Sequence, residues 1–314
     1  MIQYDDGIAA VDTEYVRPQQ DASHLIIEDG RAAFVDTGTN HSLPLLIDAL
    51  GRYGLDVGDV DYVIVTHVHL DHAGGAGSMM RAFPNATCVV HPRGAPHMVD
   101  PSKLYAATIA VYGEDRTRKM YGDIVPIDEA RIHIPEDNGR IELNGRELQF
   151  LYTEGHAKHH FCIYDATSNG VFTGDSFGVS YRELDNENGA FIMATSTPTQ
   201  FDPAEAHKAV DRIMALGPDR LFLTHFGEVT GLDKLAEDMH ECLDGYVAMA
   251  LEHANDENRP AAMQRAMFDY LATRLEQHGF EGDRDAMRAV LDIDVVLNAQ
   301  GLESWLDYMA RKNG

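Results

Sequence analysis

The stretch Asp61-Tyr-Val-Ile-Val-Thr-His-Val-His-Leu-Asp-His72 decides the fold. Its first half, residues 61–66, is a nearly continuous apolar run of strand length, which is typical of a strand buried on both faces of a sheet. Its second half places three histidines and an aspartate within six positions. The glycine-rich segment 73–77 follows and predicts a turn into a short helix through Met80 and Phe83. Residue types that bind metals therefore come immediately after the end of a predicted buried strand.

The chemistry of these four side chains points to a metal. Imidazole nitrogens and carboxylates suit borderline divalent metals such as zinc and ferrous iron. Alternate residues of an extended chain point the same way, so His67, His69 and Asp71 would share one face. A turn is required to bring His72 beside them. Four ligands can hold one ion, but their clustering predicts two neighbouring ions.

Three further ligand-type residues follow short apolar segments later in the chain. His156 lies in the segment TEGHAKHH, Asp175 ends VFTGD, and His225 ends LFLTH. Each is a weak signal alone, because a histidine or aspartate at a strand end is usually structural. Together with the first motif they predict one centre assembled from the ends of several strands.

The combined pattern, H-x-H-x-D-H followed by GH, GD and TH, resembles the metallo-β-lactamase superfamily. The resemblance covers about residues 8–231. It implies an α/β fold, the αββα sandwich, with a dinuclear metal site at one edge. The implied ligands of the first ion are His67, His69 and His156. Those of the second ion are Asp71, His72 and His225, and both ions share Asp175.

The chemistry that this resemblance implies is hydrolysis. A hydroxide that bridges two cations attacks the substrate, while the cations polarise the bond that is broken. The expected substrate is a small molecule with an ester, thioester or lactone bond. Asp71 would add a catalytic role by passing a proton to the leaving group. Zinc is the favoured metal, and iron or manganese are the alternatives.

Three other functions stay open on the same residues. The same hydroxide attacks phosphorus, which would make the protein a phosphodiesterase on a small phosphodiester. The ligands could instead stabilise a signalling or binding module in which hydrolysis is incidental. The third alternative is iron-dependent redox chemistry, as in sulfur dioxygenase-like relatives.

The spacing of the motifs limits the number of subfamilies that the chain can resemble. A long insert, residues 92–130, precedes His156, and a helical tail follows residue 231. This arrangement is similar to the alkylquinolone signal response protein, a thioesterase-like member, and its uncharacterised relatives. Glyoxalase II-type thioesterases have a much shorter insert. Acyl-homoserine lactonases carry a catalytic tyrosine where this chain has Gly178, and Tyr181 lies nearby but off register.

Five further residues are candidates for supporting the ligands or contacting substrate: Asp36, His160, Phe177, Tyr181 and Tyr105. Asp36 follows an apolar segment and either orients a ligand histidine or simply turns the chain. His160 could support His156, although a histidine at such a position more often faces solvent. For the three aromatic residues, ordinary packing is the alternative to lining a substrate pocket.

The predicted domains are a metallo-β-lactamase-like domain over residues 1–231, with the insert 92–130 near the active site, and a helical extension over 232–314 that packs on it. Helical periodicity covers 232–254, 261–277, 283–298 and 301–312. The extension is also a candidate dimerisation surface, so a homodimer is one expected form of the protein.

Composition restricts the partners and the location. The chain has 25 Lys+Arg against 51 Asp+Glu, a formal net charge of −26. Such an acidic surface repels phosphate backbones and anionic lipids, so we expect neither a nucleic acid nor a membrane as partner. Its three cysteines lie far apart and predict neither a disulfide nor a thiolate metal site. An acidic N-terminus and the lack of a long apolar run predict a cytoplasmic location.

Overall fold

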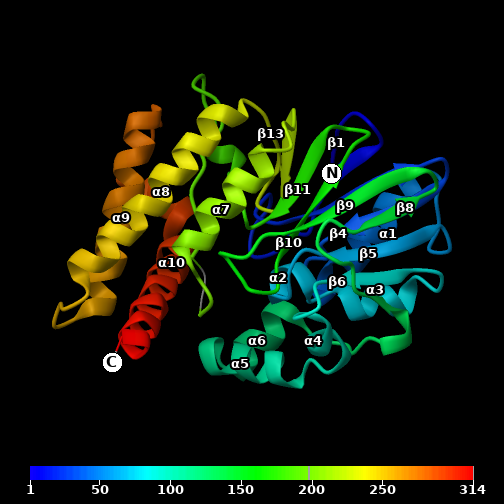
Figure 1. Ribbon diagram of the computed structural model, residues 1–314, viewed down its shortest axis with the longest axis horizontal. Helices are drawn as coiled ribbons and strands as arrows, with labels where there is room; N and C mark the ends of the chain where they lie inside the picture. The colour runs from blue at the N-terminus through cyan, green and yellow to red at the C-terminus, as the bar shows by residue number, and fades with distance from the viewer. Residues whose placement is uncertain (197–198, 314) are drawn as a thin grey trace. The chain divides into compact units, whose positions relative to one another are not determined.

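The structure, a computed structural model, describes residues 1–196 and 199–313 (Figure 1). The chain forms two compact units. The first comprises Met1–Tyr152, His159–Gly174 and Pro218–Glu228, and the second comprises Thr153–Lys158, Asp175–Gly217 and Val229–Gly314. The domain boundary after residue 231, the docking of the extension and the place of the insert near the active site stay predictions.

The first unit contains a seven-stranded sheet in the order β1-β2-β3-β4-β5-β6-β7. Its first four strands are antiparallel, and the pairs from β4 to β7 are parallel. The parallel part contains the strand predicted from residues 61–66. The bounds are β1 Ile2–Gln3, β2 Ile8–Asp12, β3 Ala22–Glu28, β4 Arg31–Val35, β5 Val60–Val65, β6 Thr87–Val90 and β7 Ile132–His133.

The second sheet has six strands in the order β13-β12-β11-β10-β9-β8. Asn144-Gly145 form the turn between β8 and β9, which pair Leu143 with Arg146 across these two residues. Strand β11 pairs with β12 in parallel, so both strands end at the same edge. The bounds are β8 Arg140–Leu143, β9 Arg146–Tyr152, β10 Phe161–Asp165, β11 Gly170–Gly174, β12 Arg220–Leu223 and β13 Gly227–Val229.

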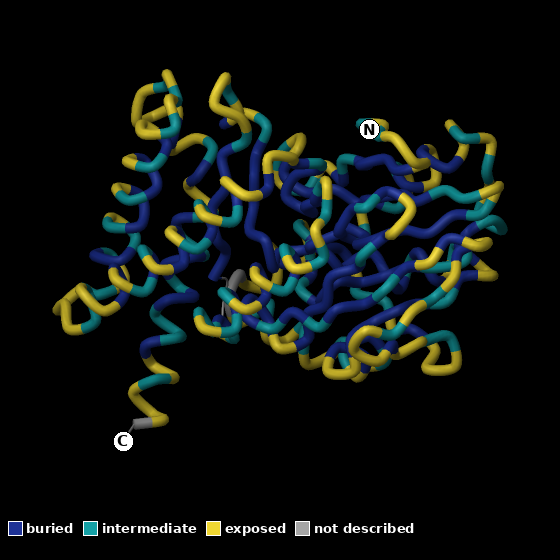
Figure 2. The backbone as a smooth tube through the Cα atoms, turned by 45° about the horizontal axis from the view of Figure 1, so that its top comes forward, coloured by how far each residue is buried: buried dark blue, intermediate teal, exposed yellow. Residues whose placement is uncertain are grey.

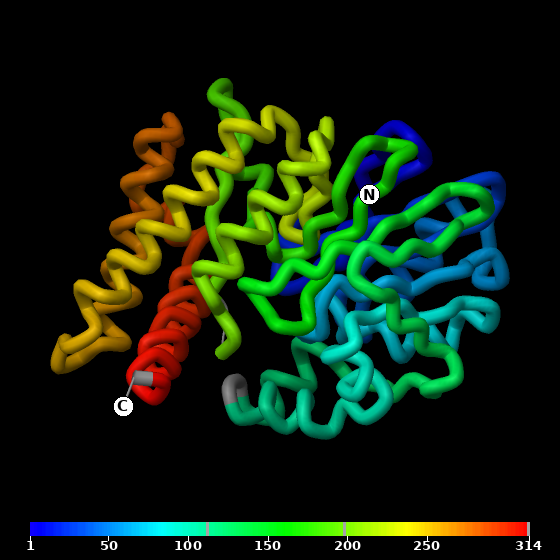
Figure 3. The backbone as a smooth tube through the Cα atoms, in the orientation of Figure 1, coloured from blue at the N-terminus to red at the C-terminus, as the bar shows by residue number. Residues whose placement is uncertain are grey.

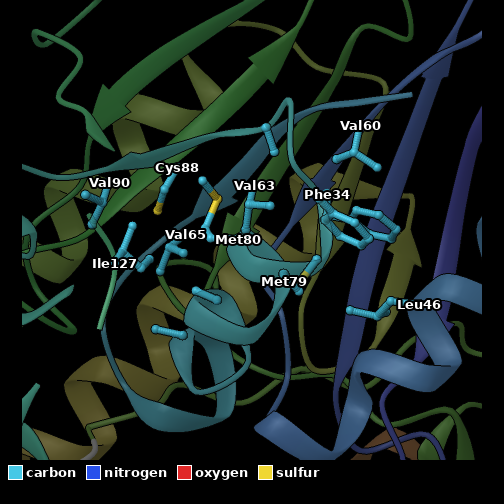
Figure 4. Packing of buried hydrophobic residues seen from close by; sticks show 14 of the residues in the cluster. Phe34, Leu46, Val60, Val63, Val65, Met79, Met80, Cys88, Val90 and Ile127 are labelled. Carbon is cyan, nitrogen blue, oxygen red and sulfur yellow. The ribbon is translucent and has the colours of Figure 1, made fainter. Parts of the chain in front are cut away.

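Strand β5 shows why residues 63–65 are apolar without interruption. Val63 and Val65 belong to one buried cluster, which includes Phe34, Met79 and Met80 (Figure 4). Ile64, which points to the opposite face, belongs to the cluster that fills the space between the two sheets. The strand is therefore buried on both faces, and the strands of both sheets are mostly dark blue in Figure 2.

Helices of the first unit follow the parallel strands. Helix α1 begins after Ser42 and has Pro44 in its first turn. The predicted insert is helical, and its sequence gives α4, α5 and α6. The bounds are α1 Leu43–Arg52, α2 Leu70–Ala73, α3 Ala76–Ala82, α4 Ala95–Val99, α5 Ser102–Tyr112 and α6 Glu114–Tyr121.

The second unit is mainly helical. Its helices are α7 (Pro203–Met214), α8 (Leu232–His253), α9 (Arg259–His278) and α10 (Arg284–Asn313), and α8, α9 and α10 pack against one another (Figure 3). Asp202 caps α7 by accepting hydrogen bonds from the backbone N–H groups of Ala204 and Glu205. No helix within the described residues is long and apolar enough to cross a membrane.

One predicted break is wrong. Residues 283–298 and 301–312 were expected as separate helices, but α10 runs through Gly301 without interruption. A Cβ at Gly301 would lie 1.6 Å from the carbonyl oxygen of Ser196. Ser196 also donates from its backbone N–H to Asn298 Oδ1 at 2.6 Å. The glycine therefore permits a close approach of the helix to this segment and does not end the helix.

A buried histidine between the two sheets makes stability depend on pH. His24 is fully buried, and its ring lies 5.4 Å from that of Phe172 and 5.8 Å from that of Phe222. Burial lowers the pKa of His24 from 6.5 to about 4, while the charge of Asp36 acts in the opposite direction. The native state therefore keeps this imidazole neutral at pH values where the unfolded chain already binds a proton.

We expect His24 to lower the free energy of unfolding by about 3 kcal/mol between pH 7 and pH 4, because only the unfolded state takes up its proton as the pH falls below 6.5. Urea denaturation of the wild type and His24→Leu at both pH values measures this difference. The variant should lose less stability than the wild type on acidification. An identical pH dependence in the two proteins would contradict the assignment.

Candidate metal centre

The histidine motif occupies the end of β5 and the first turn of the next helix. His67 and His69 lie in the connection after the strand, and His69 is the residue before α2. Asp71 and His72 lie within α2, where the backbone N–H of His72 donates to His69 O at 3.1 Å. The turn that the sequence required to bring His72 beside the earlier residues is therefore a short helix.

His67 and His69 direct ring nitrogens at each other. His67 Nε2 lies 2.9 Å from His69 Nδ1, and the His67 side chain is fully buried. The ring of His160 stacks on that of His67 at a centroid distance of 4.9 Å. Phe161 N donates to Thr66 O, which places residue 160 beside the motif. His160 is therefore buried against His67 and does not face solvent.

Asp71, His72 and His225 form a second group in the same unit. Each offers one ligand atom, and these atoms lie within 4.8 Å of one another. Asp71 Oδ2 is 3.9 Å from His72 Nε2 and 3.7 Å from His225 Nε2. Both histidines are buried, whereas the Asp71 side chain is 26% exposed. A carboxylate and two imidazoles at this spacing are a donor set that suits a divalent metal ion.

Hydrogen bonds fix the orientation of both histidines in this group. His72 Nδ1 donates to Asp36 Oδ2 at 2.8 Å, and His225 Nδ1 donates to the carbonyl oxygen of Gln20 at 2.6 Å. Each imidazole therefore presents Nε2 towards Asp71. Such oxygen acceptors behind a ligand histidine are usual in metal sites, because they set the tautomer and the ring orientation.

Asp36 is held by several donors. Its Oδ1 accepts from the Thr66 backbone N–H at 2.8 Å, and its Oδ2 accepts from Thr224 Oγ1 at 2.7 Å. The side chain is fully buried, and the backbone has a φ of +59°. Asp36 therefore lies at a turn of the chain and also holds the His72 ring by a hydrogen bond, while its role in supporting a metal ligand stays a prediction.

Asp21 is a buried carboxyl group near the cluster that the sequence did not single out. Burial raises the pKa of Asp21 from 3.8 to about 7, Asp71 adds to this rise, and His225 and His72 oppose it. Its Oδ2 accepts a hydrogen bond from Thr13 Oγ1 at 2.6 Å. No local sequence pattern indicates that Asp21, Gln20 or Thr224 lies near the cluster, because strand pairing between distant segments brings them there.

The conformation and the close neighbours of Gly174 explain why the GD pattern contains a glycine. Its φ is +49°, and a Cβ there would lie 2.5 Å from His160 Nε2 and 2.7 Å from Thr66 Oγ1. A side chain would therefore collide with two groups that support the motif. The position admits only glycine in this conformation.

His156 and Asp175 belong to the second unit. His156 Nε2 lies 3.5 Å from Asp175 Oδ2, and both side chains are nearly buried. As metal ligands they stay predictions. Gly178 lies in the same unit, and a Cβ on it would approach the carbonyl oxygen of Met193 to 2.2 Å. This conformation leaves no room for a tyrosine of the lactonase type.

The three aromatic candidates differ in exposure. Phe177 is fully buried in the second unit, and Tyr181 is 2% exposed. The Tyr181 hydroxyl donates to Asp294 Oδ1 at 3.1 Å, which gives it a structural partner. Tyr105 lies half-buried on α5 in the first unit. Their role as substrate contacts stays a prediction.

The sequence pattern of the Metallo-beta-lactamase superfamily matches residues 16–225. The chain is 26% identical over 175 residues to a metallo-beta-lactamase fold-containing protein of Sulfurisphaera tokodaii, which covers 54% of this chain and 62% of that protein. It is 23% identical over 192 residues to a probable metallo-hydrolase of Methanocaldococcus jannaschii, which covers 61% of this chain and 84% of that protein. The match thus spans less than two thirds of the length of the first of these relatives.

Solved structures share the fold. An archaeal metallo-beta-lactamase superfamily protein from Sulfolobus tokodaii has a TM-score of 0.65 at 19% identity, over 94% of this chain and 98% of that chain. A peroxy diiron form of the chemotaxis sensor ODP has a TM-score of 0.52 at 16% identity, over 76% of this chain and 93% of that chain. These likenesses confirm the predicted α/β fold with a helical C-terminal extension.

Proposed function

The chain belongs to the metallo-beta-lactamase superfamily, and on this premise we propose that it is a metal-dependent hydrolase of a small substrate. The proposed target is an ester, thioester or lactone bond. The observation that carries the proposal is the convergence of Asp71, His72 and His225, whose ligand atoms lie within 4.8 Å of one another. The relative described as a probable metallo-hydrolase supports the same class of reaction.

The side chains of the first unit fit divalent metal ions. His72 and His225 are held at Nδ1 by oxygen acceptors, so their Nε2 atoms serve as ligands together with Asp71. His67 and His69 supply a second nitrogen pair. We retain His156 and Asp175 as the two ligands contributed by the second unit. When bound, the ions would lower the pKa of a coordinated water and polarise the bond under attack.

Asp71 has a second proposed role besides binding. Its carboxylate is the exposed member of the group, with 26% of the side chain accessible, whereas the two imidazoles are buried. It can therefore take up a proton near the two imidazoles and pass it to the leaving group of the substrate. Asp36 acts only through His72, by fixing which nitrogen carries the proton.

The charge of the chain supports a small-molecule substrate. With a formal net charge of −26, the surface disfavours nucleic acids and anionic membranes as partners. We propose zinc as the metal, because imidazole and carboxylate suit it, while iron or manganese would be held by the same donors. A cytoplasmic location and a homodimer formed through the helical extension are kept as proposals.

A substrate panel with metal analysis tests this function. The purified protein is offered acyl thioesters, lactones, aryl esters and bis-nitrophenyl phosphate, and its bound metal is counted. We expect hydrolysis of at least one carboxylic ester class that is lost with a chelator and restored by zinc. Activity confined to the phosphodiester would replace the ester proposal. One bound iron with oxygen uptake would favour a sulfur dioxygenase-like reaction, and absence of all turnover in the zinc-loaded protein would favour a binding module.

A further inference from the structure

A second cluster of histidines and aspartates lies in the second unit, on α7 and α8. Helix α7 supplies His207 and Asp211, and α8 supplies His240 and Asp244. In each pair the aspartate follows the histidine by four residues, so both side chains lie on one face of their helix. The two helices pack side by side (Figures 1 and 3), and the two pairs face each other.

The two imidazoles contact each other through their Nδ1 atoms. His207 Nδ1 lies 2.7 Å from His240 Nδ1, and the rings are parallel within 5° with centroids 5.0 Å apart. Each Nε2 contacts the carboxylate of the opposite helix. His207 Nε2 is 3.3 Å from Asp244 Oδ1, and His240 Nε2 is 3.2 Å from Asp211 Oδ1.

These contacts determine where the protons lie. A carboxylate only accepts hydrogen bonds, so Asp244 and Asp211 favour a proton on Nε2 of both histidines. The two Nδ1 atoms then carry lone pairs that point at each other, which is favourable only with a cation between them. A single shared proton satisfies this requirement, and a metal ion bound by two nitrogens satisfies it as well.

We propose that His207 and His240 bind one divalent transition-metal ion, zinc or copper, through their Nδ1 atoms. A carboxylate behind each ligand imidazole is the usual arrangement in metal sites. Zn–N bonds of about 2.0–2.1 Å require the nitrogens to separate beyond their present spacing. The side chains are 28% and 32% exposed, so they can move apart and admit water as a further ligand. The bound ion would link α7 to α8.

The test compares bound zinc in three full-length proteins: wild type, the double variant His207→Gln/His240→Gln, and the matched control His253→Gln. His253 also lies on α8 and pairs with a carboxylate, Asp256, at 2.8 Å, but it contacts no second imidazole among the described residues. After equilibrium dialysis against zinc, we expect the double variant to bind one ion per chain fewer than the wild type, and the control to bind the same number. Repeating the dialysis with copper checks the second metal.

Three further variants keep the test decisive. The single variants His207→Gln and His240→Gln replace the double variant if circular dichroism shows that it is unfolded. Asp211→Asn/Asp244→Asn retains both imidazoles and should weaken the extra ion by about 10–100-fold, because the carboxylates orient the rings. Equal ion counts in the wild type and all histidine variants, or the same loss in His253→Gln, would overturn the proposal. The comparison is a difference between proteins, so it does not depend on the ions held elsewhere.

Discussion

Replacement of Asp71 by asparagine is expected to lower kcat by about 10²–10⁴-fold, the range for loss of a positioned acid or base. The change keeps the size of the side chain but removes the negative charge and the capacity to carry a proton. Asp71 lies 3.7 Å from His225 Nε2 and 3.9 Å from His72 Nε2, so the charge that balances a bound cation is lost as well. Steady-state kinetics on the substrate found by the panel, with the bound metal counted in the same sample, measures the effect.

The matched control for this variant is Asp48→Asn. Asp48 pairs with Arg52 on the exposed face of α1, and such surface pairs contribute little to stability. Its kinetics should equal those of the wild type. Wild-type turnover by a fully metal-loaded Asp71→Asn protein would remove Asp71 from the reaction, although it would leave the metal assignment intact.

Asp36→Asn is expected to weaken metal binding by about 10–100-fold, even though Asp36 itself is not a proposed ligand. The carboxylate accepts from His72 Nδ1, Thr224 Oγ1 and Thr66. An amide nitrogen at Oδ2 would face donors instead of accepting from them. His72 would then favour the tautomer with its proton on Nε2, which is the atom required for the metal.

Competitive dialysis of Asp36→Asn against a chromophoric chelator measures this loss without reference to turnover. Asp12→Asn is a suitable control, because Asp12 also accepts backbone hydrogen bonds, from Glu14 and Gln19, but these bonds are exposed and lie at the end of β2. We expect the control to bind metal like the wild type. Unchanged affinity in Asp36→Asn, with a normal far-UV spectrum, would show that Asp36 only turns the chain.

Local patterns predicted correctly the part of the first unit around the histidine motif. A buried parallel strand requires a run of apolar residues, which residues 62–65 provide, and the Asn144-Gly145 pair suits a tight hairpin turn. The metal-ligand pattern also predicted a turn that brings His72 beside the earlier residues. In the structure, this turn is helix α2. These features depend on neighbouring residues, so a single sequence suffices to find them.

Features set by distant contacts could not be predicted. The continuity of α10 through Gly301 depends on a close contact with Ser196, which lies more than a hundred positions away in the sequence. His225 donates to the backbone carbonyl of Gln20. Every residue has such a carbonyl, so the sequence does not indicate which one accepts this hydrogen bond. Asp21 likewise reaches the cluster only through the pairing of its chain segment with the strand-end residues near Thr224.

The two metal-binding proposals rest on different side chains. The first rests on ligands at strand ends, which include Asp71, His72 and His225. The second rests on His207 and His240, which lie on packed helices and contact carboxylates through their outer nitrogens. A metal count above the number expected for the first centre would therefore not by itself argue against it, because the helical cluster accounts for one additional ion.

The measurement that tests the central claim most directly is anomalous X-ray scattering at the zinc edge, on crystals of the protein prepared with zinc. We expect an anomalous peak within coordination distance of Asp71, His72 and His225, with Zn–N bonds of about 2.0–2.1 Å to the Nε2 atoms of the two histidines. We also expect a second peak beside His67 and His69. Zinc-loaded crystals with no anomalous peak near any of these five side chains would contradict the central claim.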